Sequence, residues 1–303
     1  MNRVHTQAIP IPDPGASHDV IEFLERVHAD TGEHPLSDHL RLELGGGAAP
    51  GHLGFVVTDA AGIAGYAQTS RLASGWTIET VVPPGPDPDR CVAVCGALVD
   101  AAVDHIAANG GGRVHWWARG ATSLLDAIAA DRGLVPQRTL LQMRRSLPTE
   151  VHATVACRAF LPGRDEDAWI RVNNRAFADH PEQSGWDRST LAARIAEPWF
   201  DPQGFLLHER DGRLAAFCWT KRHLDRQPQM GEIYVIAVDP DFHGHGLGRE
   251  LTLAGLDHLS ARGLHVGMLY VDAANGPAVT MYRRLGFFEA RADIAYSGVV
   301  DGR

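Results

Sequence analysis

GEIYVIAVDPDFHGHGLGR, residues 231–249, passes from a strand through a short loop into a helix and so decides the fold. The run from Ile233 to Val238 is apolar and rich in β-branched residues, which is typical of a strand covered on both faces. Pro240 cannot continue a central strand, because it lacks the backbone N–H that the ladder needs. The stretch therefore predicts a buried central strand that gives way to a loop at Asp239.

Three glycines in this loop predict a site for an anion. They are Gly244, Gly246 and Gly248, and leucines recur after them at helical spacing, so we expect a helix to begin near Gly246. Glycines at a helix start let successive backbone N–H groups surround a phosphate, and the helix dipole adds about half a positive charge there. Glycines that only permit tight packing would give the same local pattern, so the neighbouring sequence has to decide.

The sequence after the loop contains a second buried strand and a second helix. Met268–Val271 predicts the strand, Pro277–Arg284 predicts the helix, and Leu285-Gly286-Phe287 follows it. Together with V-D-P at the first strand end and the glycine loop, this order resembles the GNAT family of N-acetyltransferases, whose pattern closes with Y-x-x-x-G-F. The resemblance implies an α/β fold with a mixed α+β sheet, and acetyl-CoA as co-substrate without a metal.

The same resemblance implies which residues hold acetyl-CoA. They are Ile236, Ala237, Val238, His243, Gly244, His245, Gly246, Leu247, Gly248, Arg249 and Asn275. His243 departs from the family pattern, since it stands where Arg or Gln is usual, and this puts the side-chain part of pyrophosphate binding in doubt. The backbone part is unaffected. For Asn275, capping of the last helix is an equal alternative.

The composition is that of a globular protein that acts on small molecules. The chain of 303 residues is long enough for two domains of about 150 residues. A net charge of −9 without a basic tract argues against nucleic acid and anionic membrane surfaces, and no stretch approaches a membrane span. The N-terminus lacks a signal-peptide pattern and the four cysteines lack metal-ligand spacing. We therefore expect a cytoplasmic protein without nucleic-acid or membrane partners. A monomer is expected, although these features do not decide the oligomeric state.

The pattern around the glycine loop occurs a second time about 150 residues earlier. Residues 54–69 and 205–220 both read as strand, turn and strand. Three pairs of markers keep a nearly constant offset: Gly54 with Gly204, Pro84 with Pro240, and Gly133 with Gly286. Such a period indicates a duplicated domain rather than a solenoid repeat. We therefore expect two tandem GNAT acetyltransferase domains, residues 1–147 and 151–303.

The first copy lacks features that the chemistry needs. Its loop reads PPGPDPDRC without a G-x-G, and Asp87 and Asp89 stand where the phosphate charge would lie. Counted from the shared markers, two residues of the second copy are replaced in the first: Tyr282 by Ala129 and Glu232 by Trp76. We therefore expect a degenerate N-terminal domain and a catalytic C-terminal domain.

Acetyl transfer to an amine requires a neutral amine, a polarised thioester carbonyl and a proton for the departing thiolate. An α-amino group has a pKa of about 7.7 to 8.0, so a general base is needed, and Glu232 at the start of the central strand is the candidate. The backbone N–H near Val238 could donate to the thioester oxygen. Tyr282 could protonate the thiolate. The alternatives are an exposed strand-end glutamate and a tyrosine that only packs in the core.

A closer resemblance is to the mycothiol synthase family of actinomycetes. The motifs that carry it are Arg171-Val172-Asn173-Asn174, His180-Pro181-Glu182-Gln183, Trp199-Phe200-Asp201-Pro202, Trp219-Thr220-Lys221 and Gly231-Glu232-Ile233-Tyr234-Val235. The resemblance implies acetyl transfer to the cysteinyl amine of Cys-GlcN-Ins (desacetylmycothiol), the last step of mycothiol biosynthesis. It also implies substrate contacts at Asp38, Glu182, Lys221, Glu232 and Tyr270.

Two other functions stay open at this point. A GNAT enzyme that acetylates a protein N-terminus or an aminoglycoside would share Glu232 and Tyr282 but need a different acceptor pocket. A non-catalytic acetyl-CoA sensor would keep the glycine loop and need neither residue, so their joint presence argues against it. Asp38 would equally suit a helix cap, and Glu182 a hydrogen bond that orders its loop.

Overall fold

The computed structural model divides the chain into two compact units. It describes residues 9–11, 17–31, 34–37, 40–41, 44, 52–72, 75–83, 85, 87–120, 123–178, 180, 183–225 and 228–303. The N-terminal unit comprises Met1–Leu141, Asp272–Ala274 and Arg291–Arg303, and the C-terminal unit comprises Gln142–Val271 and Asn275–Ala290. The units differ from the two contiguous domains expected from the sequence, 1–147 and 151–303, because the C-terminal residues belong to the first unit.

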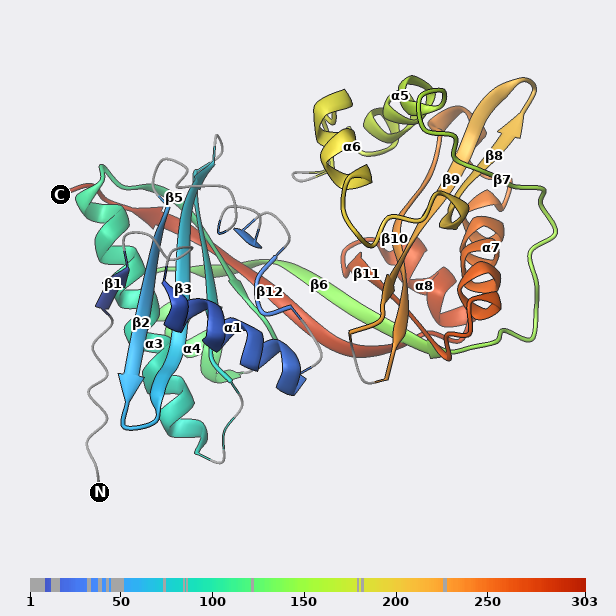
Figure 1. Ribbon diagram of the computed structural model, residues 1–303. Coiled ribbons are helices and arrows are strands. Elements are labelled where there is room, and N and C mark those ends of the chain that lie inside the picture. The colour runs from blue at the N-terminus through green and yellow to red at the C-terminus, as the bar shows by residue number, and fades with distance from the viewer. Residues whose placement is uncertain are drawn as a thin grey trace. The chain divides into compact units, whose positions relative to one another are not determined.

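Two long strands account for this difference. β6 (Val135–Ser146) begins in the N-terminal unit and ends in the C-terminal one, and β12 (Phe288–Val300) runs the opposite way (Figure 1). Within the N-terminal unit β12 pairs antiparallel with β5 (Gly112–Ala118). Within the C-terminal unit the neighbour of β6 is β11 (Val266–Asp272). Each sheet therefore includes a strand from the other half of the sequence.

The sheet of the N-terminal unit is covered by helices on both faces. Its strands lie in the order β1 (Ile9–Ile11), β2 (Leu53–Asp59), β3 (Gly62–Leu72), β4 (Gly75–Val81), β5 and β12. Figure 1 shows α3 (Pro88–Ala108) and α4 (Ser123–Ala130) on one face and α1 (His18–Thr31) on the other. Phe55 and Val57 join the core on the α3 side and Val56 packs on the α1 side, as strand alternation requires.

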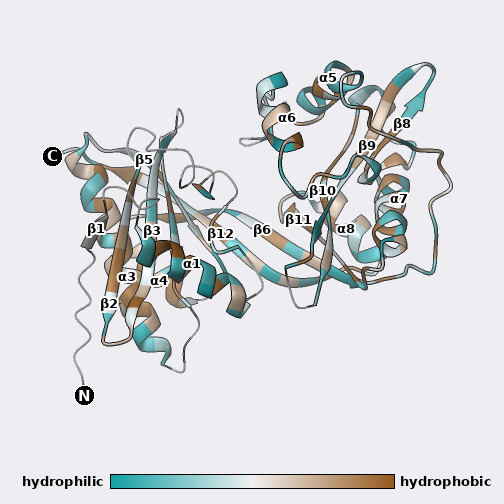
Figure 2. Cartoon of the chain, viewed as in Figure 1, coloured by the Kyte–Doolittle hydropathy of each residue, from teal (hydrophilic) through white to brown (hydrophobic). Residues whose placement is uncertain are grey.

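α1 and α3 differ in how apolar they are. α1 buries Val20, Phe23 and Val27 and exposes hydrophilic residues between them, as Figure 2 shows. By length and composition α3 could cross a membrane, a feature not expected from the sequence. In the N-terminal unit, however, Val94 and Leu98 of α3 belong to the buried core cluster. In the structure this apolar helix therefore packs against the sheet as part of the core.

The C-terminal unit has a sheet of the same order. Its strands are β7 (Arg158–Ala159), β8 (Phe205–Arg210), β9 (Arg213–His223), β10 (Met230–Val238), β11 and the end of β6. Its helices are α5 (Glu166–Ala176), α6 (Arg188–Ile195), η1 (Pro202–Gly204), η2 (Pro240–Phe242), α7 (Leu247–Ala261) and α8 (Gly276–Arg284). An aromatic core that includes Trp169, Phe217 and Trp219 lies on the α5 side. Gly255 of α7 contacts Cys218 and Ile233, which point to the other face.

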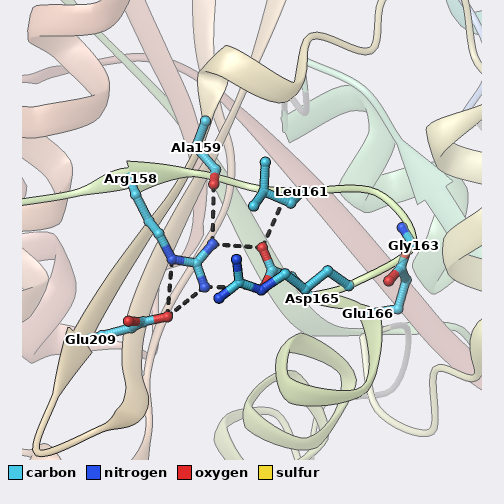
Figure 3. Close-up of polar contacts among 8 residues, drawn as sticks. Arg158, Ala159, Leu161, Gly163, Asp165, Glu166 and Glu209 are labelled. Atoms are coloured by element: carbon cyan, nitrogen blue, oxygen red, sulfur yellow. Dashed lines mark hydrogen bonds and ion pairs between the residues drawn. The ribbon is translucent and has the colours of Figure 1, made fainter.

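One arginine ties the outer edge of this unit together (Figure 3). Arg158 of β7 donates to both carboxylate oxygens of Asp165, at 2.6 and 3.0 Å, and Asp165 is the N-cap residue of α5. Arg158 Nε also donates to Glu209 of β8 at 3.0 Å. Leu161 N donates to Asp165 at 2.8 Å and fixes the turn between them. This cluster joins β7 and β8 to the start of α5.

Candidate active site

The central strand β10 separates from its neighbour halfway along its length. β10 pairs in parallel with β11 from Gly231 opposite Gly267 to Ile233 opposite Leu269, although both strands are fully described and continue further. At the same point the pairing of β10 with β9 shifts by one residue, at Tyr234. Such a bulge increases the local twist of a strand. The backbone of β10 beyond Ile233 therefore lacks a ladder partner on the β11 side, which opens an edge for a ligand.

The glycine loop leads from this strand to an uncapped helix. Gly244 has φ +82° and Gly246 φ +74°, values that favour glycine. Gly246 is the N-cap residue of α7, and no side chain accepts a hydrogen bond from the first turn. The N–H groups of that turn therefore remain available to an anion. The predicted helix start at Gly246 is confirmed.

His243 fills the position where the family usually has Arg or Gln. Its Nε2 lies 3.0 Å from the carbonyl oxygen of Val238, and because a carbonyl only accepts, the imidazole nitrogen is the donor. The side chain therefore ties the loop back to the end of β10. His245 and Arg249 are exposed beside it, and Arg249 donates to the neighbouring Glu250 at 2.6 Å.

A cavity of about 510 Å³ adjoins the start of α7. It is lined by Arg249, Gly276, Pro277, Thr280, Met281, Arg284 and Leu285. Two arginines and no acidic residue line this space, so it suits an anionic group. Asn275 stands next to it and caps α8, because its side-chain oxygen accepts from Ala278 N at 3.2 Å. Of the two roles considered for Asn275, capping is the one that the structure shows.

Tyr282 lies on α8 and is 5% exposed. Its ring packs edge-on against Phe287, with 5.7 Å between centroids. Burial, and to a lesser extent the nearby Cys218 thiol, raises the pKa of the Tyr282 phenol well above its ordinary value. Among the described residues its hydroxyl has no hydrogen-bond partner. The phenol is therefore protonated at neutral pH and has a proton to donate.

Glu232 is buried, with 7% of its surface exposed, so it is not an exposed strand-end residue. It lies directly opposite Lys221 of β9. One carboxylate oxygen, Oε2, lies 2.7 Å from His223 Nε2, and the His223 side chain is equally buried. The Lys221 ammonium lies 4.6 Å from the centre of the Trp199 ring and 5.3 Å from that of Tyr234. The structure thus brings together a carboxylate, an imidazole and an ammonium beside the opening in β10.

His223 is the functional candidate that the sequence reasoning missed. A signal was present, because residues two apart on a strand share a face, and Lys221 and His223 are two apart. Tyr270 of β11 accepts a hydrogen bond from Gln142 at 2.8 Å. The other two predicted substrate contacts, Asp38 and Glu182, lie outside the described residues.

The bulge at Tyr234 also corrects the comparison of the two copies. Glu232 was matched with Trp76, but strand pairing matches it with Thr77, since Thr77 lies opposite Ser70 as Glu232 lies opposite Lys221. The burial pattern agrees: Trp76 packs in the core on the α3 side, and its new counterpart Gly231 packs against Leu259 of α7. The extra residue in β10 shifted the count by one. The match of Tyr282 with Ala129 is unaffected, because it was counted back from Gly286, which follows the bulge in the sequence, and from Gly133.

Comparison with known proteins defines the class first. Residues 169–287 match the acetyltransferase (GNAT) family. The fold resembles a GCN5-related N-acetyltransferase from Sphaerobacter thermophilus, with a TM-score of 0.71 at 19% identity over 98% of this chain and 97% of that one. It also resembles a tandem GNAT protein from the clavulanic acid biosynthesis pathway, with a TM-score of 0.64 at 13% identity over 98% and 99%. The chain is an acetyltransferase with the predicted tandem GNAT fold.

Sequence relatives then define the family within this class. The chain is 45% identical over 294 residues to the mycothiol acetyltransferase of Thermomonospora curvata, with 94% of each chain covered. It is 42% identical over 293 residues to that of Thermobispora bispora, with 93% of this chain and 96% of the relative covered. The chain belongs to the mycothiol acetyltransferase family, and the resemblance drawn from its motifs is confirmed.

Proposed function

We propose that the C-terminal unit transfers the acetyl group of acetyl-CoA to the cysteinyl amine of Cys-GlcN-Ins, the last step of mycothiol biosynthesis. The observation that carries this proposal is the buried Glu232, set with Lys221 and His223 at the point where β10 separates from β11. The family relatives support the choice of acceptor. The expected cytoplasmic location is part of the same proposal.

Acetyl-CoA would bind along the path from β10 to α8. The open edge of Ile236, Ala237 and Val238 suits the amide-bearing arm of CoA, because an extended chain can pair there as a strand would. The N–H groups from Gly244 to Arg249 suit the pyrophosphate, since the helix start is uncapped. The arginine-lined cavity beside α8 then suits a further phosphate group.

The chemistry follows from two positioned proton carriers. Glu232 takes a proton from the ammonium of the acceptor, and the neutral amine nitrogen attacks the thioester carbonyl carbon. The carbon–sulfur bond breaks, and the thiolate that leaves takes a proton from the Tyr282 hydroxyl, which its raised pKa keeps in place until then. The N–H near Val238 donates to the carbonyl oxygen while negative charge develops on it.

The acceptor would be held on the polar face formed by β9, β10 and β11. Lys221 would donate to hydroxyl or carbonyl oxygens of the sugar part, and the two aromatic rings beside it keep its ammonium in place. Tyr270 would contribute a further polar contact, and contacts at Glu182 and Asp38 stay predictions from the family resemblance. Carboxylates suit both an ammonium and the hydroxyls of a polyol.

The test is a comparison of acceptors with the intact enzyme. We expect kcat/KM for Cys-GlcN-Ins to exceed that for free cysteine by about 10²-fold or more, because free cysteine leaves buried polar groups unpaired, at about 1–3 kcal/mol each. Lys221→Met should narrow the gap by weakening the full acceptor more than cysteine. Equal values for both acceptors would remove the proposed acceptor and leave the acetyltransferase class intact. Higher activity on a peptide N-terminus or an aminoglycoside would favour another GNAT function.

A sensor that binds acetyl-CoA without turnover is the remaining alternative. It predicts that acetyl-CoA protects the enzyme from thermal unfolding and that no acceptor releases CoA. The buried Glu232 argues against it, because a buried carboxylate is costly to desolvate and serves no need of a sensor. Release of free CoA with Cys-GlcN-Ins present, measured by thiol titration, decides between the two.

A further inference from the structure

His223 and Glu232 form a buried pair that the chemistry described so far does not use. His223 Nε2 and Glu232 Oε2 are 2.7 Å apart, and their side chains are 6% and 9% exposed. An ionised carboxylate only accepts hydrogen bonds, so Nε2 must carry the proton and donate it. This short, charge-assisted bond fixes one of the two carboxylate oxygens.

The pair is diagonal rather than directly cross-strand. Met230 lies opposite His223, and Lys221 lies opposite Glu232, so the Glu232 carboxylate reaches one pair along the ladder to meet the imidazole. Among the described residues, Glu232 is the one polar partner of the His223 side chain. An imidazole that served only to stabilise the sheet would not need to be buried against the proposed base. Its placement therefore indicates a role in the reaction.

We propose that His223 is a positioning residue for the acetyl transfer, which holds the Glu232 carboxylate by its Oε2 atom. The proposal rests on the function proposed above and deepens it. Held in this way, the carboxylate is restricted to one orientation before the amine arrives, and less entropy is lost when the proton is transferred. His223 does not itself touch the acceptor.

The N-terminal unit provides a comparison. Strand pairing places Leu72 where His223 stands, since Leu72 lies opposite Gly75 as His223 lies opposite Met230. In the same unit Thr77 takes the place of Glu232. The imidazole and the carboxylate are thus both present in one copy and both replaced in the other, as a pair that works together would require.

The test uses two substitutions of His223 that differ in whether they keep a donor. His223→Gln places an amide N–H where Nε2 was, so it should keep kcat with Cys-GlcN-Ins within about threefold of the wild type. His223→Leu keeps volume and removes the donor, so kcat should fall by roughly 10- to 100-fold, while KM for acetyl-CoA stays the same. His223→Asn, whose amide is too short to reach Glu232, should behave like His223→Leu and serves if the leucine variant does not fold.

A double-mutant cycle separates positioning from a general structural role. If His223 acts through Glu232, His223→Leu should cost nothing further in a Glu232→Gln enzyme. An equal loss in both backgrounds, or full activity of both donor-less variants in folded protein, would overturn the inference. Neither result touches the function proposed above, which fails only if the wild-type enzyme does not acetylate Cys-GlcN-Ins. Circular dichroism and the unfolding temperature establish that each variant is folded.

Discussion

The helices α3 and α7, which follow the central strands of the two units, begin in opposite ways. In the N-terminal unit Asp87 caps α3, and its side chain accepts from Arg90 N at 3.1 Å. In the C-terminal unit Gly246 occupies the same place at α7 and offers no side-chain acceptor. One helix start is therefore satisfied by the protein's own carboxylate, and the other is left for an external anion. The two helix starts thus differ by a single capping residue.

The central strands of the two units, β4 and β10, also differ in how they pair with their neighbours. β4 keeps unbroken register with β3 from Tyr66 opposite Val81 to Leu72 opposite Gly75. β10 has an extra residue, Tyr234, in its ladder with β9. Both strands stop pairing with their parallel neighbour before they end, β10 after Ile233 and β4 after Glu79. The difference between the two strands is therefore the bulge, which leaves one residue of β10 unpaired with β9 and increases its twist. The polar side chains follow this division, because the buried carboxylate and the buried tyrosine of the site both belong to the C-terminal unit.

The largest effect is expected from giving α7 the cap that α3 already has. Gly246→Asp should abolish acetyl transfer, on the order of 10³-fold or more, because a carboxylate would occupy the helix start and repel the pyrophosphate. The left-handed backbone at Gly246 adds strain for any side chain. Turnover and the shift in unfolding temperature with acetyl-CoA measure the loss.

Gly212→Asp is the matched control for this change. Gly212 has φ +71° in the turn between β8 and β9, and the first carbon of a side chain placed there would meet open space, as it would at Gly246. It therefore carries the same strain and the same added charge away from the loop. Gly212→Asp should keep activity within about threefold. Residual turnover in Gly246→Asp, traced to acetyl-CoA bound in the N-terminal unit, would contradict the division of roles.

The next effect compares a buried glutamate from each unit. Glu232→Gln should lower kcat by about 10²-fold or more, because the amide cannot take the amine's proton. Glu79→Gln in β4 is the control: Glu79 is 3% exposed, accepts from Ser37 N at 2.9 Å and lies 3.6 Å from an Arg119 nitrogen. The Glu79→Gln protein should be less stable than the wild type, and its kcat should be unchanged. Near-normal turnover in a folded Glu232→Gln enzyme would exclude Glu232 as the base.

A similar comparison applies to two buried tyrosines. Tyr282→Phe should lower kcat by about 10²-fold, since the leaving thiolate loses its proton donor. Tyr296→Phe removes a hydroxyl that donates to Asp126 at 2.7 Å in the N-terminal unit, and it should leave kcat unchanged. Kinetics with saturating acetyl-CoA measure both. If the two variants behave alike, Tyr282 is a core residue and the proton comes from elsewhere.

These comparisons also show what the sequence could predict. The strand ending at Val238 and the helix starting after Gly246 are local patterns, and the structure confirms both. The partner of β12 could not be predicted, because strand exchange depends on pairing between distant segments. The bulge at Tyr234 was missed for a related reason: it shows only in the register with β9, and it shifted the match of Glu232 by one residue. His223 was missed because its partner lies across the strands.

The smallest effect concerns one glycine in each of the helices α3 and α7. Gly96 of α3 and Gly255 of α7 each lie nine positions after the N-cap residue of their helix. A methyl group at Gly255 would lie 2.6 Å from Cys218 Sγ and 2.6 Å from Ile233 Cδ1. At Gly96 the nearest atom is Arg132 Nη2, at an ordinary 3.5 Å. At this level α7 therefore turns its glycine towards the strands at close range, whereas α3 turns its own towards Arg132.

Alanine at the two glycines should accordingly change stability in opposite directions. In Gly96→Ala the gain in helix propensity, about 0.5–1 kcal/mol, is unopposed. In Gly255→Ala the overlap costs about 1–3 kcal/mol and exceeds that gain, because the fully buried Cys218 has no room to move. Urea unfolding of both variants measures whether the free energy of unfolding rises or falls in each. A Gly255→Ala protein as stable as the wild type would show that β9 and β10 can yield under α7, and the rigid placement of Glu232 next to Ile233 would then need another cause.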